Sequence, residues 1–184
     1  MHIMGNAAES VANEWPWVTW LVADRGYPNG MMHQCGSSLV QVCKEKKESD
    51  IVVTAAHCVS YVNNATKRTH IVPARNITVI AGRHKTIDTP TQQLVIRDVE
   101  HVIISPSYNG NRESKKIPHD IAVLKLIKPI KFTRKIRAIC LPNGRGDIPL
   151  KESQCWVAGW GTRLHIGERD KYLSAFLCED FHGS

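Results

Sequence analysis

Two segments of this 184-residue chain carry the residue types that nucleophilic catalysis requires. Residues 51–58, Ile-Val-Val-Thr-Ala-Ala-His-Cys, place the imidazole of His57 directly after a β-type run, and Asp120 opens a second apolar run. An aspartate that accepts the hydrogen bond of an imidazole N–H fixes the ring tautomer and stabilises the imidazolium that a general base becomes. Taken singly, a strand-end histidine is usually structural and a strand-end aspartate is usually solvated. The hypothesis that His57 is a catalytic base therefore depends on the presence of both residues.

Short β-type runs separated by turns must position these two side chains. The runs are residues 17–23, 35–42, 50–54, 76–81, 94–104 and 121–127. Residues 26–30, 63–75, 82–90 and 105–118 between them have the composition of turns and loops. Six spaced strands without helical periodicity predict an all-β barrel or sandwich. Residues 128–153 are rich in proline and glycine and are interpreted as a connector, after which residues 154–160 form one more strand.

Composition and charge narrow the class of protein and its partners. Apolar residues make up 42% of the chain and charged residues 22%, which is typical of a globular domain. No apolar run reaches the roughly 20 residues of a membrane span. The formal net charge is +7, and the basic residues form two clusters: Lys44, Lys46 and Lys47, then Lys125, Lys128, Lys131, Arg134, Lys135 and Arg137. No RNA-binding signature accompanies them, so we expect acidic polymers rather than nucleic acid as the partner of this surface, or simple solvation.

The order of motifs resembles that of the trypsin-like (chymotrypsin-fold) serine proteases, peptidase family S1. The resemblance covers residues 3–162 and rests on these segments: Ile-Met-Gly-Asn at 3–6, Trp-Pro-Trp at 15–17, Cys-Gly-Ser-Ser-Leu at 35–39, Thr-Ala-Ala-His-Cys at 54–58, Asp-Ile-Ala-Val-Leu at 120–124 and Cys-Trp-Val-Ala-Gly-Trp-Gly-Thr at 155–162. It implies a double β-barrel with the active site between the barrels. Residues 3–127 would form a complete first barrel, residues 128–153 the connector, and residues 154–184 the start of the second barrel with a divergent tail.

The resemblance also implies roles for individual residues. His57 would be the general base, Asp120 its orienting carboxylate, and Cys35–Cys58 the disulfide beside the histidine. The activity implied is serine-type endopeptidase hydrolysis of protein or peptide substrates, with no cofactor and no metal. The family is secreted, although no signal peptide is visible at the start of this chain.

The family's Gly-Asp-Ser-Gly-Gly motif, which would supply the serine nucleophile, does not occur in these 184 residues. We therefore expect a truncated form without nucleophile, oxyanion hole or specificity pocket, and expect this chain to be inactive by itself. A catalytically dead relative that acts as a basic binding module is the alternative, and a partial chain completed by a partner is a third. The start of the second barrel would then leave the strand at 155–160 with an unpaired edge.

The remaining cysteines and two glycosylation sequons complete the expectations. The sequence leaves open the pairing of Cys43, Cys140, Cys155 and Cys178. None of the six cysteines belongs to a C-x-x-C pair, so a zinc ribbon or a thioredoxin-like motif is not expected. The sequons at Asn64 and Asn76, together with the dispersed cysteines, favour a secreted glycoprotein.

Overall fold

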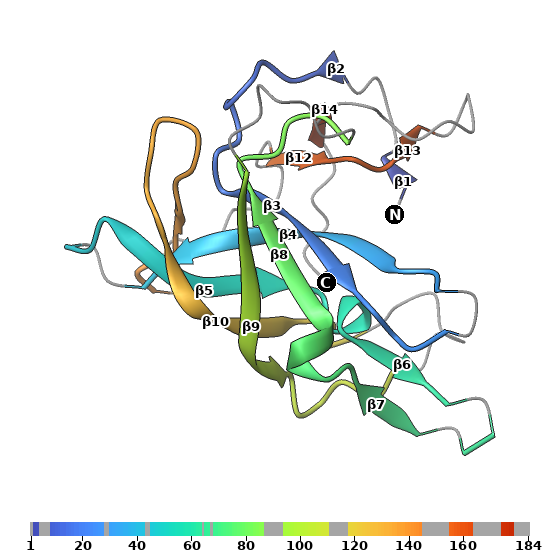
Figure 1. The fold of residues 1–184 in the computed structure, drawn as a ribbon. Coiled ribbons are helices and arrows are strands. Elements are labelled where there is room, and N and C mark those ends of the chain that lie inside the picture. Colours follow the sequence, from blue (N-terminus) through green and yellow to red (C-terminus); the bar gives the residue numbers. More distant parts are fainter. Residues whose placement is uncertain are drawn as a thin grey trace.

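The computed structural model shows a barrel of antiparallel strands with a smaller sheet above one end (Figure 1). The structure describes residues 2–3, 8–27, 30–42, 45–63, 65–66, 68–86, 94–110, 118–144, 155–163 and 174–178. Within these ranges almost every regular element is a strand, as the alternating apolar pattern of the sequence predicts.

Six strands close the barrel. They are β3 (Val18–Ala23), β4 (His33–Gln41), β5 (Glu48–Thr54), β8 (Ile77–Ala81), β9 (Val95–Ile104) and β10 (Ala122–Lys131). Their order is β4-β3-β8-β9-β10-β5, and β5 pairs back onto β4, so the sheet has no free edge in this ring. All of these pairings are antiparallel. The expectation of a closed six-stranded first barrel is confirmed.

The barrel interior is filled by the inward-facing residues of these strands. On β10 the side chains of Ala122, Leu124 and Leu126 are buried, while Val123 and Lys125 between them are only partly buried. The same period of two runs along β8, where Ile77, Val79 and Ala81 have no exposed surface. This alternation builds one apolar core and holds the strand ends that carry the candidate site.

The elements depart most clearly from the expected ones in two places. The strand expected to end at residue 127 continues to Lys131, across Pro129, and the connector therefore begins later than residue 128. Proline is tolerated there because the β5 pairing has a register shift between Lys125 and Ile130, where a ladder N–H is not needed. The stretch 63–75, interpreted as a loop, contains β7 (Thr69–Ile71) and the start of a 3₁₀ turn, η2 (Ala74–Asn76). β7 pairs with β6 (Ser60–Val62) as a short hairpin, a local pairing that the composition of this stretch did not reveal.

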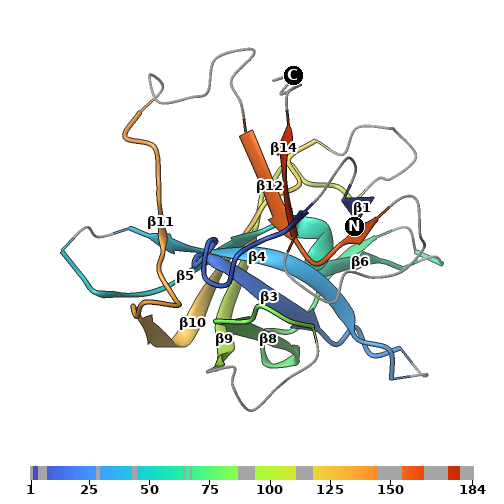
Figure 2. The ribbon, with the colours of Figure 1, turned by 90° about the horizontal axis from the view of Figure 1, so that it is seen from above.

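Beyond the barrel, β11 (Ile139–Cys140) adds in parallel to β4. Two smaller sheets follow: β12 (Cys155–Gly159), β14 (Ser174–Cys178) and β2 (Ala8–Glu9) form one, and β1 (His2–Ile3) pairs with β13 (Thr162–Arg163) in the other. Figure 2 shows β12 and β14 running side by side above the barrel. The edge of the 155–160 strand expected to be unpaired is therefore paired with β14 on one side.

Tryptophan rings join this upper sheet to the barrel. The Trp160 ring lies 5.1 Å from that of Trp20 on β3, and the Trp156 ring lies 5.7 Å from that of Trp15. The Trp160 indole N–H also donates to the His84 carbonyl oxygen at 3.0 Å. None of the described helices is long and apolar enough to cross a membrane.

Candidate active site

His57 is positioned by the turn that ends β5. The strand stops at Thr54, whose hydroxyl donates to the Gly36 carbonyl oxygen on β4 at 2.9 Å. The chain then forms η1 (Ala56–Cys58), a single 3₁₀ turn closed by the bond from the Cys58 N–H to the Ala55 carbonyl oxygen. Ala56 is fully buried in the barrel core, so a larger side chain would have to displace its neighbours. The small residues before the histidine are thus explained by the tight turn against the barrel.

Asp120 is positioned by a turn directly before β10, the strand that pairs with β5. His119 has a positive φ of 59°, which is uncommon for a residue other than glycine. The Ile121 N–H donates to the His119 carbonyl oxygen at 2.8 Å and the Ser105 N–H donates to the Ile121 carbonyl oxygen at 3.0 Å. This turn directs the carboxylate toward η1 immediately before β10 begins. The unfavourable backbone conformation of His119 therefore lies directly beside the candidate site.

The two side chains meet as expected from the paired motifs. His57 Nδ1 lies 2.6 Å from Asp120 Oδ2, and the His57 backbone N–H donates to Asp120 Oδ1 at 2.8 Å. Side-chain exposure is 34% for the histidine and 18% for the aspartate. Because a carboxylate only accepts hydrogen bonds, Nδ1 carries the proton and Nε2 is the basic atom. The arrangement can take up a proton at Nε2 and stabilise the resulting cation.

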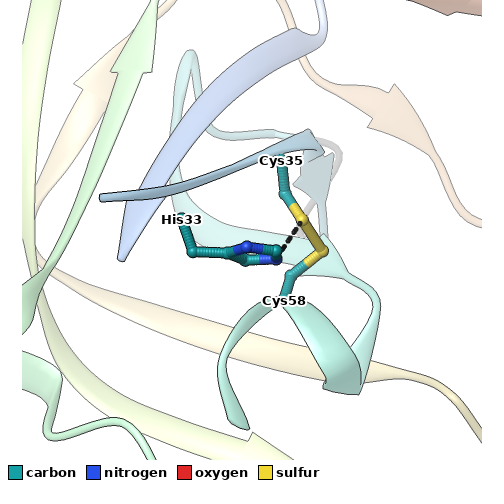
Figure 3. Close-up of side chains that lie close together, drawn as sticks. All are labelled: His33, Cys35 and Cys58. Carbon is teal, nitrogen blue, oxygen red and sulfur yellow. Dashed lines mark hydrogen bonds between the residues drawn. A yellow bond between two sulfur atoms is a disulfide. The ribbon is translucent and has the colours of Figure 1, made fainter. Parts of the chain in front are cut away.

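A disulfide next to His57 fastens η1 to β4. Cys35 on β4 and Cys58 in η1 are joined, with Cα atoms 6.0 Å apart, as the sequence resemblance implied. His33 Nε2 lies 3.6 Å from the Cys35 sulfur (Figure 3), and His57 Nε2 lies 3.6 Å from the Cys58 sulfur. The ligand-type atoms of His33, Cys35 and Cys58 come within 4.8 Å of one another, but both sulfurs are bonded to each other and neither is a thiolate that could bind a metal.

Sequence reasoning missed two residues of this neighbourhood. The Arg25 guanidinium, from the segment after β3, donates from Nη2 to the His57 carbonyl oxygen. The His57 backbone is therefore held at its N–H by Asp120 and at its carbonyl by Arg25. His33 was the second. Neither residue lies in the motifs that named the site, and only the packing of β3 and β4 beside η1 brings them there.

Three buried serines of the barrel use their hydroxyl groups in hydrogen bonds to backbone carbonyl oxygens. Ser37, Ser49 and Ser60 are buried, and their hydroxyls donate to the carbonyl oxygens of Thr19, Val40 and Ala56, respectively. Among the described residues, the contact recorded for His57 Nε2 is with the Cys58 sulfur of the disulfide. The described part of the site is therefore an imidazole that is hydrogen-bonded to a carboxylate.

The two predicted glycosylation sites differ in what the structure shows. Asn64 lies outside the described residues. Asn76 ends η2 and is half-buried, and its side-chain amide donates to the Asp24 carbonyl oxygen at 3.4 Å. A glycan on that nitrogen would have to replace this hydrogen bond.

The chain was compared with known families and solved structures. The family model described as Trypsin matches residues 4–175. A solved structure described as "Structure of GrC" superposes with a TM-score of 0.70 at 27% sequence identity, and the match covers 95% of this chain. The chain spans 64% of the length of that structure.

Proposed function

Because this chain belongs to the trypsin family of serine proteases, we propose that its 184 residues contribute the acid–base half of a trypsin-like serine endopeptidase and do not include the nucleophile. The observation that carries the proposal is the hydrogen bond from His57 Nδ1 to Asp120 at the rim of the closed barrel. In such a site His57 Nε2 would take the proton of an attacking serine hydroxyl and later give it to the leaving amine, and Asp120 would hold the ring. Protein or peptide substrates are proposed from the family.

The 184 residues contain no Gly-Asp-Ser-Gly-Gly, so the oxyanion hole and specificity pocket of the family have no counterpart among them. Without a nucleophile and oxyanion donors, even the residual catalysis of about 10³–10⁴ over water that a damaged triad retains is not expected. We expect the refolded, oxidised chain to leave peptide substrates intact and to remain unlabelled by a fluorophosphonate probe. Labelling at any serine would overturn the proposal of an inactive chain.

A second experiment tests the endopeptidase assignment itself. Transcripts that encode residues 1–160 should be sequenced, and any product that continues in frame into Gly-Asp-Ser-Gly-Gly should be expressed. That product should cleave peptides and react with the probe, and His57→Ala should abolish cleavage while Asp98→Asn, an exposed change on β9, should not. If no transcript carries the motif, the endopeptidase proposal fails for this chain and the binding alternative below takes its place.

The alternative is a catalytically dead relative that binds an acidic polymer, and one observation favours it. The Phe132 N–H donates to the Lys47 carbonyl oxygen at 2.8 Å. The start of β5 and the end of β10 therefore lie side by side and bring the two basic clusters of the sequence together. Lys46, Lys47, Lys131 and Arg134 are all exposed there, with Glu45 and Glu48 partly offsetting them. Such a surface would attract sulfated polysaccharide.

The test of this alternative is chromatography on immobilised heparin. The chain should elute at higher salt than Lys131→Glu, whereas Arg75→Glu, which replaces an exposed positive charge on η2 by a negative one in the same way, should change the elution much less. Equal shifts for the two variants would mean that net charge alone governs retention, and the binding surface would be rejected.

We also propose that the protein is secreted, and the family together with the Cys35–Cys58 disulfide supports this. Glycosylation at Asn64 and Asn76 belongs to the same proposal. Expression in secreting mammalian cells followed by glycosidase treatment would test both, because a mass that does not change would remove the glycoprotein assignment.

A further inference from the structure

The pairing of β12 with β14 brings two cysteines opposite each other. The register is unbroken from Cys155↔Cys178 at one end to Gly159↔Ser174 at the other. Figure 2 shows the two strands adjacent. The sequence alone left the pairing of Cys155 and Cys178 open, because the surroundings of Cys178 match no expected partner site.

The backbone geometry of such a pair suits a disulfide. Directly opposed residues of an antiparallel ladder have Cα atoms about 4.5–5.5 Å apart and direct their Cβ atoms to the same face of the sheet. Disulfides span Cα separations of about 4.4–6.8 Å. The ladder spacing expected for Cys155 and Cys178 therefore lies within the range that a disulfide spans.

The state of Cys155 agrees with an intramolecular partner. Its thiol is unpaired in the structure and half-buried, whereas the thiol of Cys140 is unpaired and exposed. The barrel of the same chain already contains the Cys35–Cys58 disulfide, so oxidised cysteines are part of this fold. A half-buried thiol directly opposite another cysteine reacts more readily within the chain than with a second molecule, because the partner is held at a high effective concentration.

We propose that Cys155 and Cys178 form a cross-strand disulfide that fastens β14 to β12. One thiolate attacks a disulfide oxidant, such as glutathione disulfide, and releases one glutathione thiolate. The second cysteine thiolate then attacks the mixed disulfide and releases the other, so two thiols lose two protons and two electrons and the oxidant gains them. The proposal depends on the secretion proposed above only for the supply of such an oxidant.

The bond would do more than join two strands. β14 also pairs with β2, with Ser174 opposite Glu9 and Ala175 opposite Ala8, so a cross-link at Cys178 secures the middle strand of the three-stranded sheet. It would keep one edge of β12 covered by the chain's own strand and prevent a strand of another molecule from taking that place. This cysteine pairing differs from that of the family, in which the counterpart of Cys155 pairs further downstream.

The test maps the cysteines of the oxidised chain. The protein is folded in a glutathione redox buffer, free thiols are alkylated under denaturing conditions, and tryptic peptides are identified by mass spectrometry without reduction. The expected result is a peptide pair that joins residues 155 and 178 and separates on reduction, with Cys140 alkylated. Cys155→Ser and Cys178→Ser should each leave the remaining member of the pair alkylated, whereas the matched control Cys140→Ser should keep the cross-link.

Two results would overturn the proposal. One is full alkylation of both Cys155 and Cys178 in a chain whose Cys35–Cys58 bond has formed. The other is a cross-link from Cys155 to any other cysteine, including a disulfide-linked dimer on a non-reducing gel. The mapping needs no peptidase activity, so its outcome is independent of whether the endopeptidase assignment survives.

Discussion

Replacing Asp120 by asparagine should reverse the tautomer of the His57 ring. The carboxylate accepts two bonds from this one residue, at 2.6 Å from Nδ1 and at 2.8 Å from the backbone N–H. An asparagine keeps an oxygen for the backbone N–H, but its amide group toward the ring is a donor. Nδ1 must then lose its proton to become an acceptor, and the proton moves to Nε2. The basic atom would no longer face the position a nucleophile would occupy.

The loss in stability can be bounded from the same contacts. A hydrogen bond to a charged group contributes about 1.5–3 kcal/mol. Because the Asp120 side chain is 18% exposed and His57 34%, solvent screens the pair and the lower end of that range is expected for Asp120→Asn. Asp120→Ala also leaves the His57 N–H without its acceptor, so it should cost about 1–3 kcal/mol more.

Long-range ¹H–¹⁵N correlation spectra of the histidine rings measure the tautomer directly. His57→Gln identifies the signal, and Asp98→Asn is the matched control because that carboxylate is exposed on β9. Urea unfolding of the same variants gives the free energies. If Asp120→Asn leaves the proton on Nδ1, the carboxylate does not set the tautomer and the reasoning from this bond is refuted.

Three further predictions concern the barrel around the site. Replacing Cys35 and Cys58 together by alanine opens a loop of about 24 residues and should lower the free energy of unfolding in urea by about 3–4 kcal/mol, and an unchanged midpoint would contradict the constraint on the unfolded chain. Leu124→Ala should cost about 2–5 kcal/mol because this side chain has no exposed surface, whereas Ile127→Ala, at 57% exposure, should cost less than about 0.5; equal costs would contradict the assigned faces of β10. The hydrogen bond of the Lys125 ammonium group to the Asp50 carboxylate raises the pKa of Lys125 above its ordinary value of 10.5. The contribution of this ion pair to folding stability is therefore complete below pH 10.5 and is lost as the pH rises through the raised pKa of the folded state. Thermal midpoints of Lys125→Met and the parent chain should therefore differ near about pH 8 and converge only in strongly alkaline buffer, and earlier convergence would count against the ion pair.

Much of the fold and half of the site could be predicted from local patterns. The alternation along 77–81 and 122–126 determines which side chains enter the barrel, because a strand places successive residues on opposite faces. The small residues before His57 and the position of Asp120 at the mouth of an apolar run identified the dyad that the structure brings together at 2.6 Å. The alternation depends on residues that are neighbours in the chain, whereas the pairing of His57 with Asp120, 63 residues apart, was supported by the resemblance of their motifs to those of the serine proteases.

Other contacts depended on which distant segments pack together. The Arg25 guanidinium on the His57 carbonyl, the meeting of Lys47 with Phe132, and the continuation of β10 through Pro129 all result from strand pairing across the barrel. β14 offered no motif, yet it pairs with β12 and places Cys178 opposite Cys155. Register between strands distant in sequence is set by the summed burial and hydrogen bonding of the whole sheet, so only the tertiary structure decides it.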